Sequence, residues 1–178
     1  MMKNMILTDE TKSLLQEYFL TMQRMLAAGF SRRGVQKSFE EMMHPIMGKD
    51  SWRPTHISES AVAEYVIGSQ RNIQRAHGIL PGRMNRIDRT MSILEGDFKS
   101  FNEWWSFFTY HDSTILITRK EHGANIKFEK SDLIELPSWN EDMFRNSGFS
   151  VNLRKKTEGV WIRSKHSELI GVNLTNVS

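Results

Sequence analysis

No cysteine occurs among the 178 residues of this sequence. Its absence excludes disulfide bonds, zinc sites built on cysteine and thiol nucleophiles, and it fits a reducing cytoplasm. No apolar run approaches the roughly 20 residues that a membrane-spanning helix requires. The first residues do not resemble a signal peptide. We therefore expect a cytoplasmic protein that has no membrane partner.

The sequence also lacks strong metal and repeat signatures. It contains neither an H-E-x-x-H motif nor a His-x-His pair, and it shows no internal repeat. What is present is a globular composition, with 39% hydrophobic and 25% charged residues, which is enough to bury a core. The net charge of +3 permits anionic partners without requiring them.

Helix caps and apolar spacing predict a helical first part of the chain. Thr8 is an N-cap candidate for a first helix, and Ser31 is one for a second helix. Between them, Gly29 suits the end of a helix. Apolar residues recur at helical spacing in both segments, so residues 1–48 are predicted to form a helical hairpin that leads into the rest of the chain.

The central region, residues 49–123, is predicted to contain helices and one buried strand. It opens with a polar loop, after which Ser58 can cap a short helix. Ser100 and Glu103 form a capping-box pattern before an aromatic helix. Residues 113–117 are apolar and β-branched, which is typical of a buried strand, and a second capping box follows directly in the sequence T-R-K-E.

The last region, residues 124–178, is predicted to be a small β-containing tail. Val151 and Leu153 alternate with polar neighbours, so residues 150–165 are expected to form an antiparallel β-hairpin. The whole chain, residues 1–178, is therefore predicted to be a single domain of the α+β class, mainly helical, with a small antiparallel sheet towards the C-terminus.

One group of residues has the chemistry of a hydrolytic site: His77, His111, Asp112, Glu121 and His122. Imidazoles and carboxylates are the ligands and proton carriers that a metal site without cysteine needs. A strand edge that carries one His and a helix that carries another is the general plan of an HNH-type nuclease. The alternative is a set of unrelated histidines on loops and helix ends, with Glu121 occupied as a helix cap.

A second group is a row of arginines: Arg71, Arg75, Arg83, Arg86 and Arg89. Arginine makes bidentate contacts with phosphates, and a row of arginines along a helix could follow a nucleic-acid backbone. The alternative is a solvated helix face with acidic residues nearby.

A third group, Trp104, Trp105, Phe107 and Phe108, lies on the capped helix before the buried strand. Aromatic residues in this position usually form the core. Base stacking is the alternative role.

The motifs R-A-H-G-I-L-P and I-T-R-K-E-H, followed by E-L-P and N-S-G-F-S-V, resemble HNH-like (His-Me finger) proteins of phages and mobile elements. The resemblance covers about residues 71–151. It makes His77 the family histidine, Pro81 the nearby proline and Glu121 with His122 the closing pair. Ala76 stands where the family pattern has an acid.

This resemblance implies a divalent-metal-dependent nuclease that hydrolyses phosphodiester bonds in nucleic acid, DNA more than RNA. His77 and His122 would be catalytic, with His77 as the general base. Beside the positions that match the family, the chemistry of the residues predicts that His111, Asp112 and His122 hold Mg²⁺, Mn²⁺ or Zn²⁺, which stabilises the phosphate oxygens. The arginine row would hold the backbone.

A non-enzymatic protein is the alternative function. It would be a phage or plasmid regulator that binds nucleic acid, or an inhibitor of a host protein, and it would need no cofactor. Ala76 favours this alternative, whereas the grouping of histidines favours the enzyme.

Overall fold

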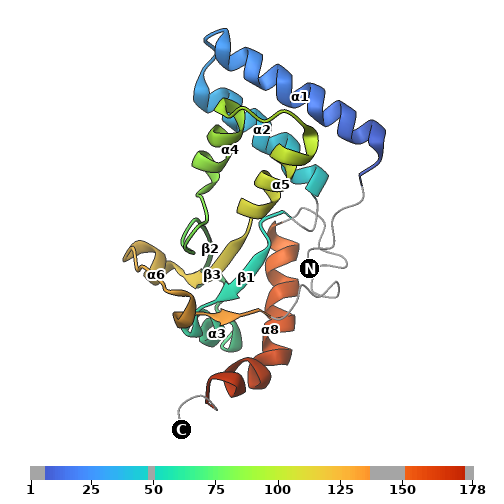
Figure 1. Cartoon of the computed structure of the whole chain (residues 1–178). Coiled ribbons are helices and arrows are strands. Elements are labelled where there is room, and N and C mark those ends of the chain that lie inside the picture. Colours follow the sequence, from blue (N-terminus) through green and yellow to red (C-terminus); the bar gives the residue numbers. More distant parts are fainter. Residues whose placement is uncertain (1–6, 48–50, 137–150, 175–178) are drawn as a thin grey trace. The chain divides into compact units, whose positions relative to one another are not determined.

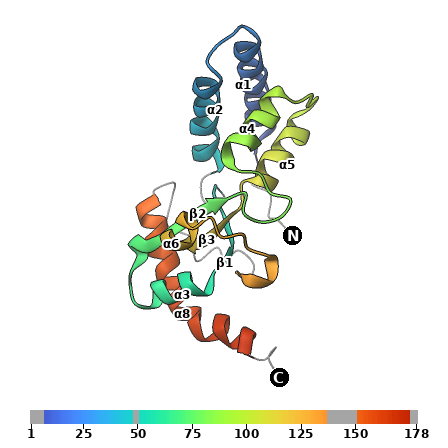
Figure 2. The same cartoon turned by 90° about the vertical axis from the view of Figure 1, so that its left-hand side faces the viewer.

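The computed structural model describes residues 7–47, 51–136 and 151–174. The chain forms two compact units, and each unit is made of two separate stretches. The second stretch of unit 1 is an insertion between two paired strands of unit 2 (Figures 1 and 2). Unit 1 comprises Met1–Ser51 and Met84–Asp112, and unit 2 comprises Trp52–Arg83 and Ser113–Ser178.

All regular secondary structure among the described residues of unit 1 is helical. Backbone N–H groups in the first turns of three helices donate to the side chains of Thr8, Asn85 and Ser100, which cap the N-termini of these helices. The predicted caps Thr8 and Ser100 are therefore confirmed. Pro45 lies within the last turn of the second helix. The helices are α1 (Asp9–Ala27), α2 (Arg32–Met47), α4 (Arg86–Glu95) and α5 (Phe101–His111).

Aromatic rings form the centre of the unit 1 core. Trp104 stacks on Phe19 at 5.2 Å between ring centroids, and Phe39 meets Phe108 edge to face at 5.9 Å. All four are fully buried. The Trp104 indole N–H also donates to the Gln16 side chain at 2.8 Å, so its polar atom is satisfied. The prediction that Trp104 and Phe108 belong to the core is confirmed.

Unit 2 is built on a four-stranded mixed sheet with the order β2-β3-β1-β4. β1 pairs parallel with β3, while β2 with β3 and β1 with β4 are antiparallel. The strands are β1 (Pro54–Ile57), β2 (Ile73–His77), β3 (Thr114–Thr118) and β4 (Ile134–Glu135). The helical elements are α3 (Glu59–Val66), η2 (Gln70–Asn72), α6 (Arg119–Gly123), η3 (Lys130–Asp132) and α8 (Val151–Leu174).

The two faces of this sheet have different coverings. On one face, Ile57 and Leu116 pack with residues of α3 and α8, such as Tyr65 and Ile162. On the other face lies a smaller apolar cluster, against which the loop after β2 packs. Successive residues of a strand point to opposite faces, so the strand register decides which polar side chains belong to which face. The smaller cluster consists of Ala76, Ile115, Ile117, Phe128 and Leu133, with Ile79 and Leu80 beside it.

The mainly helical α+β class is confirmed, but two local predictions were wrong. Residues 150–165 do not form a β-hairpin, because residues from Val151 onward belong to the long helix α8. The segment expected as a polar loop before Ser58 contains β1, which lies inside the sheet between β3 and β4. No helix within the described residues combines the length and apolarity needed to cross a membrane.

Candidate functional site

A surface pocket of about 540 Å³ lies in unit 2 on the side of the loop that follows β2. Its volume is within the range of small-ligand sites, about 300–1,000 Å³. Two separate segments form it, namely the loop after β2 and the segment from α6 to η3. The lining residues are Gly78–Arg83, Glu121, His122 and Asn125–Glu129.

The loop on one side of the pocket is shaped by two glycines with left-handed backbone. Gly78 has a φ of 70° and Gly82 a φ of 74°, a conformation that costs little only in glycine. Arg83 N–H donates to the Leu80 carbonyl at 3.1 Å and closes a turn around Pro81 and Gly82. Ile79 and Leu80 pack on the apolar cluster of the sheet. The loop is thereby anchored at its apolar side, and Arg83 is left at the pocket.

The pocket lining carries two cationic residues, Arg83 and Lys127, two acids, Glu121 and Glu129, and one histidine, His122. Arg83 is half-buried, whereas His122 and Lys127 are exposed. The carboxylate of Glu121 already accepts hydrogen bonds from Thr118 N–H at 2.7 Å, from the Thr118 hydroxyl and from the Ser58 hydroxyl. The predicted capping box at Thr118 and Glu121 is therefore confirmed, and this acid is committed to holding α6.

His77 does not line this pocket. It ends β2 opposite Thr114, and alternation along the strand places it on the face of Arg75 and Ile73, opposite to that of Ala76. Its ring meets Trp52 edge to face at 5.8 Å. The structure therefore does not bring His77 and His122 into one pocket.

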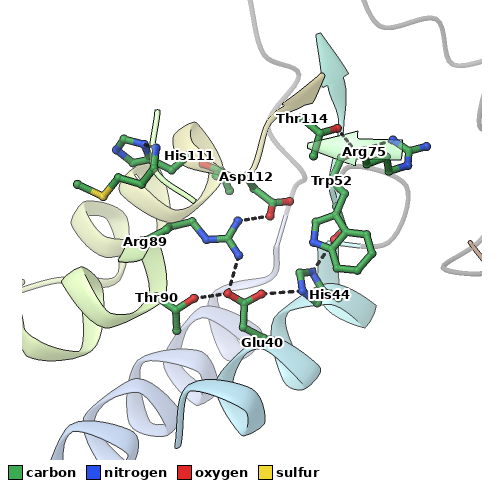
Figure 3. Close-up of polar contacts among 12 residues, drawn as sticks. Glu40, His44, Trp52, Arg75, Arg89, Thr90, His111, Asp112 and Thr114 are labelled. Atoms are coloured by element: carbon green, nitrogen blue, oxygen red, sulfur yellow. Dashed lines mark hydrogen bonds and ion pairs between the residues drawn. The ribbon is translucent and has the colours of Figure 1, made fainter. Parts of the chain in front are cut away.

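His111 and Asp112 belong to unit 1, where a buried charge cluster engages Asp112 (Figure 3). The Arg89 guanidinium, fully buried, donates to Asp112 and also to Glu40, the latter at 2.7 Å. It lies over the Phe108 ring with 4.1 Å between Cζ and the ring centroid. His111 accepts at Nδ1 from the backbone N–H of Met84 at 3.2 Å.

The same cluster continues from Glu40 along α2. The second carboxylate oxygen of Glu40 lies 2.7 Å from His44 Nε2, and His44 Nδ1 lies 2.6 Å from the Ser51 hydroxyl. Thr90 donates its hydroxyl to Glu40. Burial alone raises the pKa of Glu40. The hydrogen bond with His44 and the charge of Arg89 outweigh burial and lower that pKa to about 2.

Of the predicted metal ligands, His111 and Asp112 belong to unit 1, whereas His122 belongs to unit 2. Asp112 is paired with Arg89, and His111 is engaged with the Met84 backbone. Within the part of the chain that the structure describes, no group of three His, Asp or Glu side chains is arranged to hold a metal ion. His122 lines the pocket of unit 2.

The arginines of the predicted row lie in different environments. Arg89 is buried in its ion pairs, and Arg75 pairs with Glu158 of α8 and donates to a backbone carbonyl, so neither can hold a phosphate backbone. The predicted role in nucleic-acid binding is therefore wrong for these two residues, because each is buried beside acids that are distant in the sequence. Arg71 and Arg86 are exposed, and Arg83 lies at the pocket.

Sequence reasoning missed Glu40, His44 and His56. Gln36, Glu40 and His44 recur every four residues, which puts them on one stripe of α2 that turned out to be buried. That spacing indicates a shared helix face and could have drawn attention to Glu40 and His44. No comparable pattern marked His56, because the strand that carries it was not predicted.

No protein-family model, no curated protein and no solved structure matches this chain. The geometry of the two units alone therefore supports what is proposed below.

Proposed function

We propose that the protein binds the phosphate backbone of nucleic acid through the pocket of unit 2, as a non-enzymatic binding protein. The observation that supports this is the charge around the pocket. Arg83 together with residues 119–130 carries five Lys or Arg residues against two Glu residues. Phosphate contacts from such residues supply most of the affinity of non-specific nucleic-acid binding.

The two acids of this region are held in different ways. The carboxylate of Glu121 accepts three hydrogen bonds from groups of unit 2. Glu129 belongs to the capping box of η3 with Asp132 and is exposed to solvent. His122 and Lys127 are exposed on the opposite side of the pocket from the loop of Arg83, so a phosphate between the two segments meets donors from both.

The decisive experiment measures binding of a labelled 20-base-pair DNA duplex against salt. The double variant R83A/K127A should bind more weakly and should lower the salt slope by about 2, since each lost phosphate contact changes it by about 0.9. The matched control is R24A/R33A, which removes two exposed arginines from unit 1. Equal binding by both double variants would refute the pocket. An RNA duplex tests the preference for DNA.

A second candidate is phosphodiester hydrolysis, as the resemblance to HNH-like proteins implies. One specific observation favours it: β2 is antiparallel to β3, and α6, which carries His122, begins directly after β3. This is the strand, strand and helix order expected of that site. Against it stands the separation of His77 from the pocket and the lack of a ligand group in the described residues.

Cleavage is tested on supercoiled plasmid and on RNA with Mg²⁺ or Mn²⁺ added. A nuclease that uses these residues should lose activity in H77A and in H122A. Binding in the first assay with no cleavage here supports the binding protein alone. If neither binding nor cleavage is found at low salt, a protein partner is the remaining function, and affinity capture with the wild-type chain is the next measurement.

A further inference from the structure

A buried histidine lies on the sheet face that backs the pocket. His56 of β1 is 6% exposed. Its register partner on β3 is Ile115, a member of the apolar cluster on which Ile79 and Leu80 pack. Ile57, the next residue, belongs to the opposite face with α3 and α8. His56 therefore shares its face with the floor of the pocket.

The hydrogen bonds of His56 leave one ring nitrogen available. Its Nδ1 lies 3.0 Å from the Thr55 hydroxyl oxygen, and that hydroxyl donates to the Thr114 carbonyl at 3.4 Å. Because the Thr55 hydroxyl donates elsewhere, Nδ1 of His56 is the donor to Thr55. A lone pair is then left on Nε2. Nε2 is buried and has no hydrogen-bond partner within the described residues. This atom can accept a proton.

Three charged groups act on this ring from three elements. Arg83 comes from the pocket loop, Lys130 from η3 and Glu135 from β4, where it is the register partner of His56. Burial lowers the pKa of His56 most, Glu135 opposes this, and Lys130 and Arg83 lower it further. The ring is consequently uncharged at neutral pH. A phosphate beside Arg83 would offset the repulsion of these cations and favour the charged ring.

We propose that the pocket is a proton-linked anion site, in which a phosphate group at Arg83 is bound together with a proton on Nε2 of His56. This rests on the proposed binding of phosphate at the pocket. Because linkage is reciprocal, a proton on His56 strengthens phosphate binding by the same factor as phosphate favours the proton. Binding should therefore tighten as the pH falls.

The test compares duplex affinity at pH 5.5 and pH 8 in wild type, H56Q and the control variant H166Q. When the pH falls from 8 to 5.5, the duplex affinity of wild type should rise at least about fivefold more than that of H56Q. This factor lies within the usual range of coupling between two sites. H56Q should keep the wild-type affinity at pH 8, where His56 is uncharged. H166Q should retain the extra gain, because His166 lies on α8 and does not line the pocket.

A variant-free measurement guards against misfolding of H56Q. The NMR titration of the His56 ring in wild type should move to higher pH when saturating duplex is added. If the duplex binds at pH 8 but neither the His56 titration nor the affinity ratio changes, the proton-linked site is overturned while the proposed function stands. If no duplex binds at any pH, both are overturned.

Discussion

Two arginines six residues apart show how differently the two units use the same side chain. Arg89 in unit 1 is fully buried, lies over Phe108 and pairs with two carboxylates. Arg83 in unit 2 lies at a pocket beside exposed cations. The first neutralises acids inside a core, whereas the second adds to a local excess of positive charge. Burial beside acids, and not residue type or spacing, separates Arg89 from Arg83, for which we propose phosphate binding.

The largest effect should come from breaking the charge cluster of unit 1. Arg89→Met leaves Glu40 and Asp112 buried without their shared cation. Removing one partner of a buried ion pair costs about 3–5 kcal/mol of the free energy of unfolding. Urea denaturation measures this loss. The control on the same helix is Arg86→Met, an exposed position expected to change stability by less than about 0.5 kcal/mol. Similar losses for the two variants would contradict the cluster.

A somewhat smaller effect should appear as acid sensitivity. The pKa of Glu40 is lowered from an ordinary 4.5 to about 2, so the stability that it contributes is complete above about pH 4.5 and is lost as the pH falls towards 2. A lowering of that size corresponds to about 3 kcal/mol. Glu40→Gln should therefore be less stable than wild type at pH 7, and this difference should shrink steadily between pH 4.5 and pH 2.

The measurement is a series of urea denaturation curves from pH 7 to pH 2. Exposed Glu17 in α1 supplies the matched variant E17Q, which should follow wild type throughout. A difference between E40Q and wild type that stays constant with pH would show that the carboxylate charge has no part in the cluster.

The fold could be predicted from the sequence wherever its cause was local. The caps at Thr8, Ser58, Ser100 and Thr118 were all found, because each joins a side chain to a backbone group three residues away. The strand before Thr118 was found for a similar reason, since an unbroken apolar run needs no knowledge of its partners.

What failed depended on distant partners. β1 has only four residues and becomes a strand by pairing with β3 about 60 residues later. The buried pair of Arg89 with Glu40 spans 49 residues, and that of Arg75 with Glu158 spans 83. A row of arginines at helical spacing therefore looked like one surface. The alternation at Val151 was too short to outweigh the helix that buries Glu158, Ile162 and Leu169.

The comparison extends within unit 2, where Arg75 behaves like Arg89. It pairs with buried Glu158 and donates to the Trp52 carbonyl at 2.8 Å. Arg75→Met should lower the free energy of unfolding by about 2 kcal/mol, the scale of hydrogen bonds to charged groups. Hydrogen–deuterium exchange should rise in peptides of α8 and β2. Arg71→Met, exposed in η2, should leave exchange there unchanged, and equal rises would contradict the assigned pair.

The smallest effect on stability should come from substitutions of the pocket residues. These substitutions test the contrast between Arg83 and Arg89 most directly. R83A/K127A removes two positive charges from a region with an excess of them, so its free energy of unfolding should stay within about 0.5 kcal/mol of wild type. The same protein should show the weakened duplex binding proposed above. Arg89→Met should show the opposite pattern. Its free energy of unfolding should fall, while the pocket residues themselves are unchanged. If R83A/K127A instead unfolds as readily as Arg89→Met, the pocket cations are structural, and the distinction between the two arginines fails.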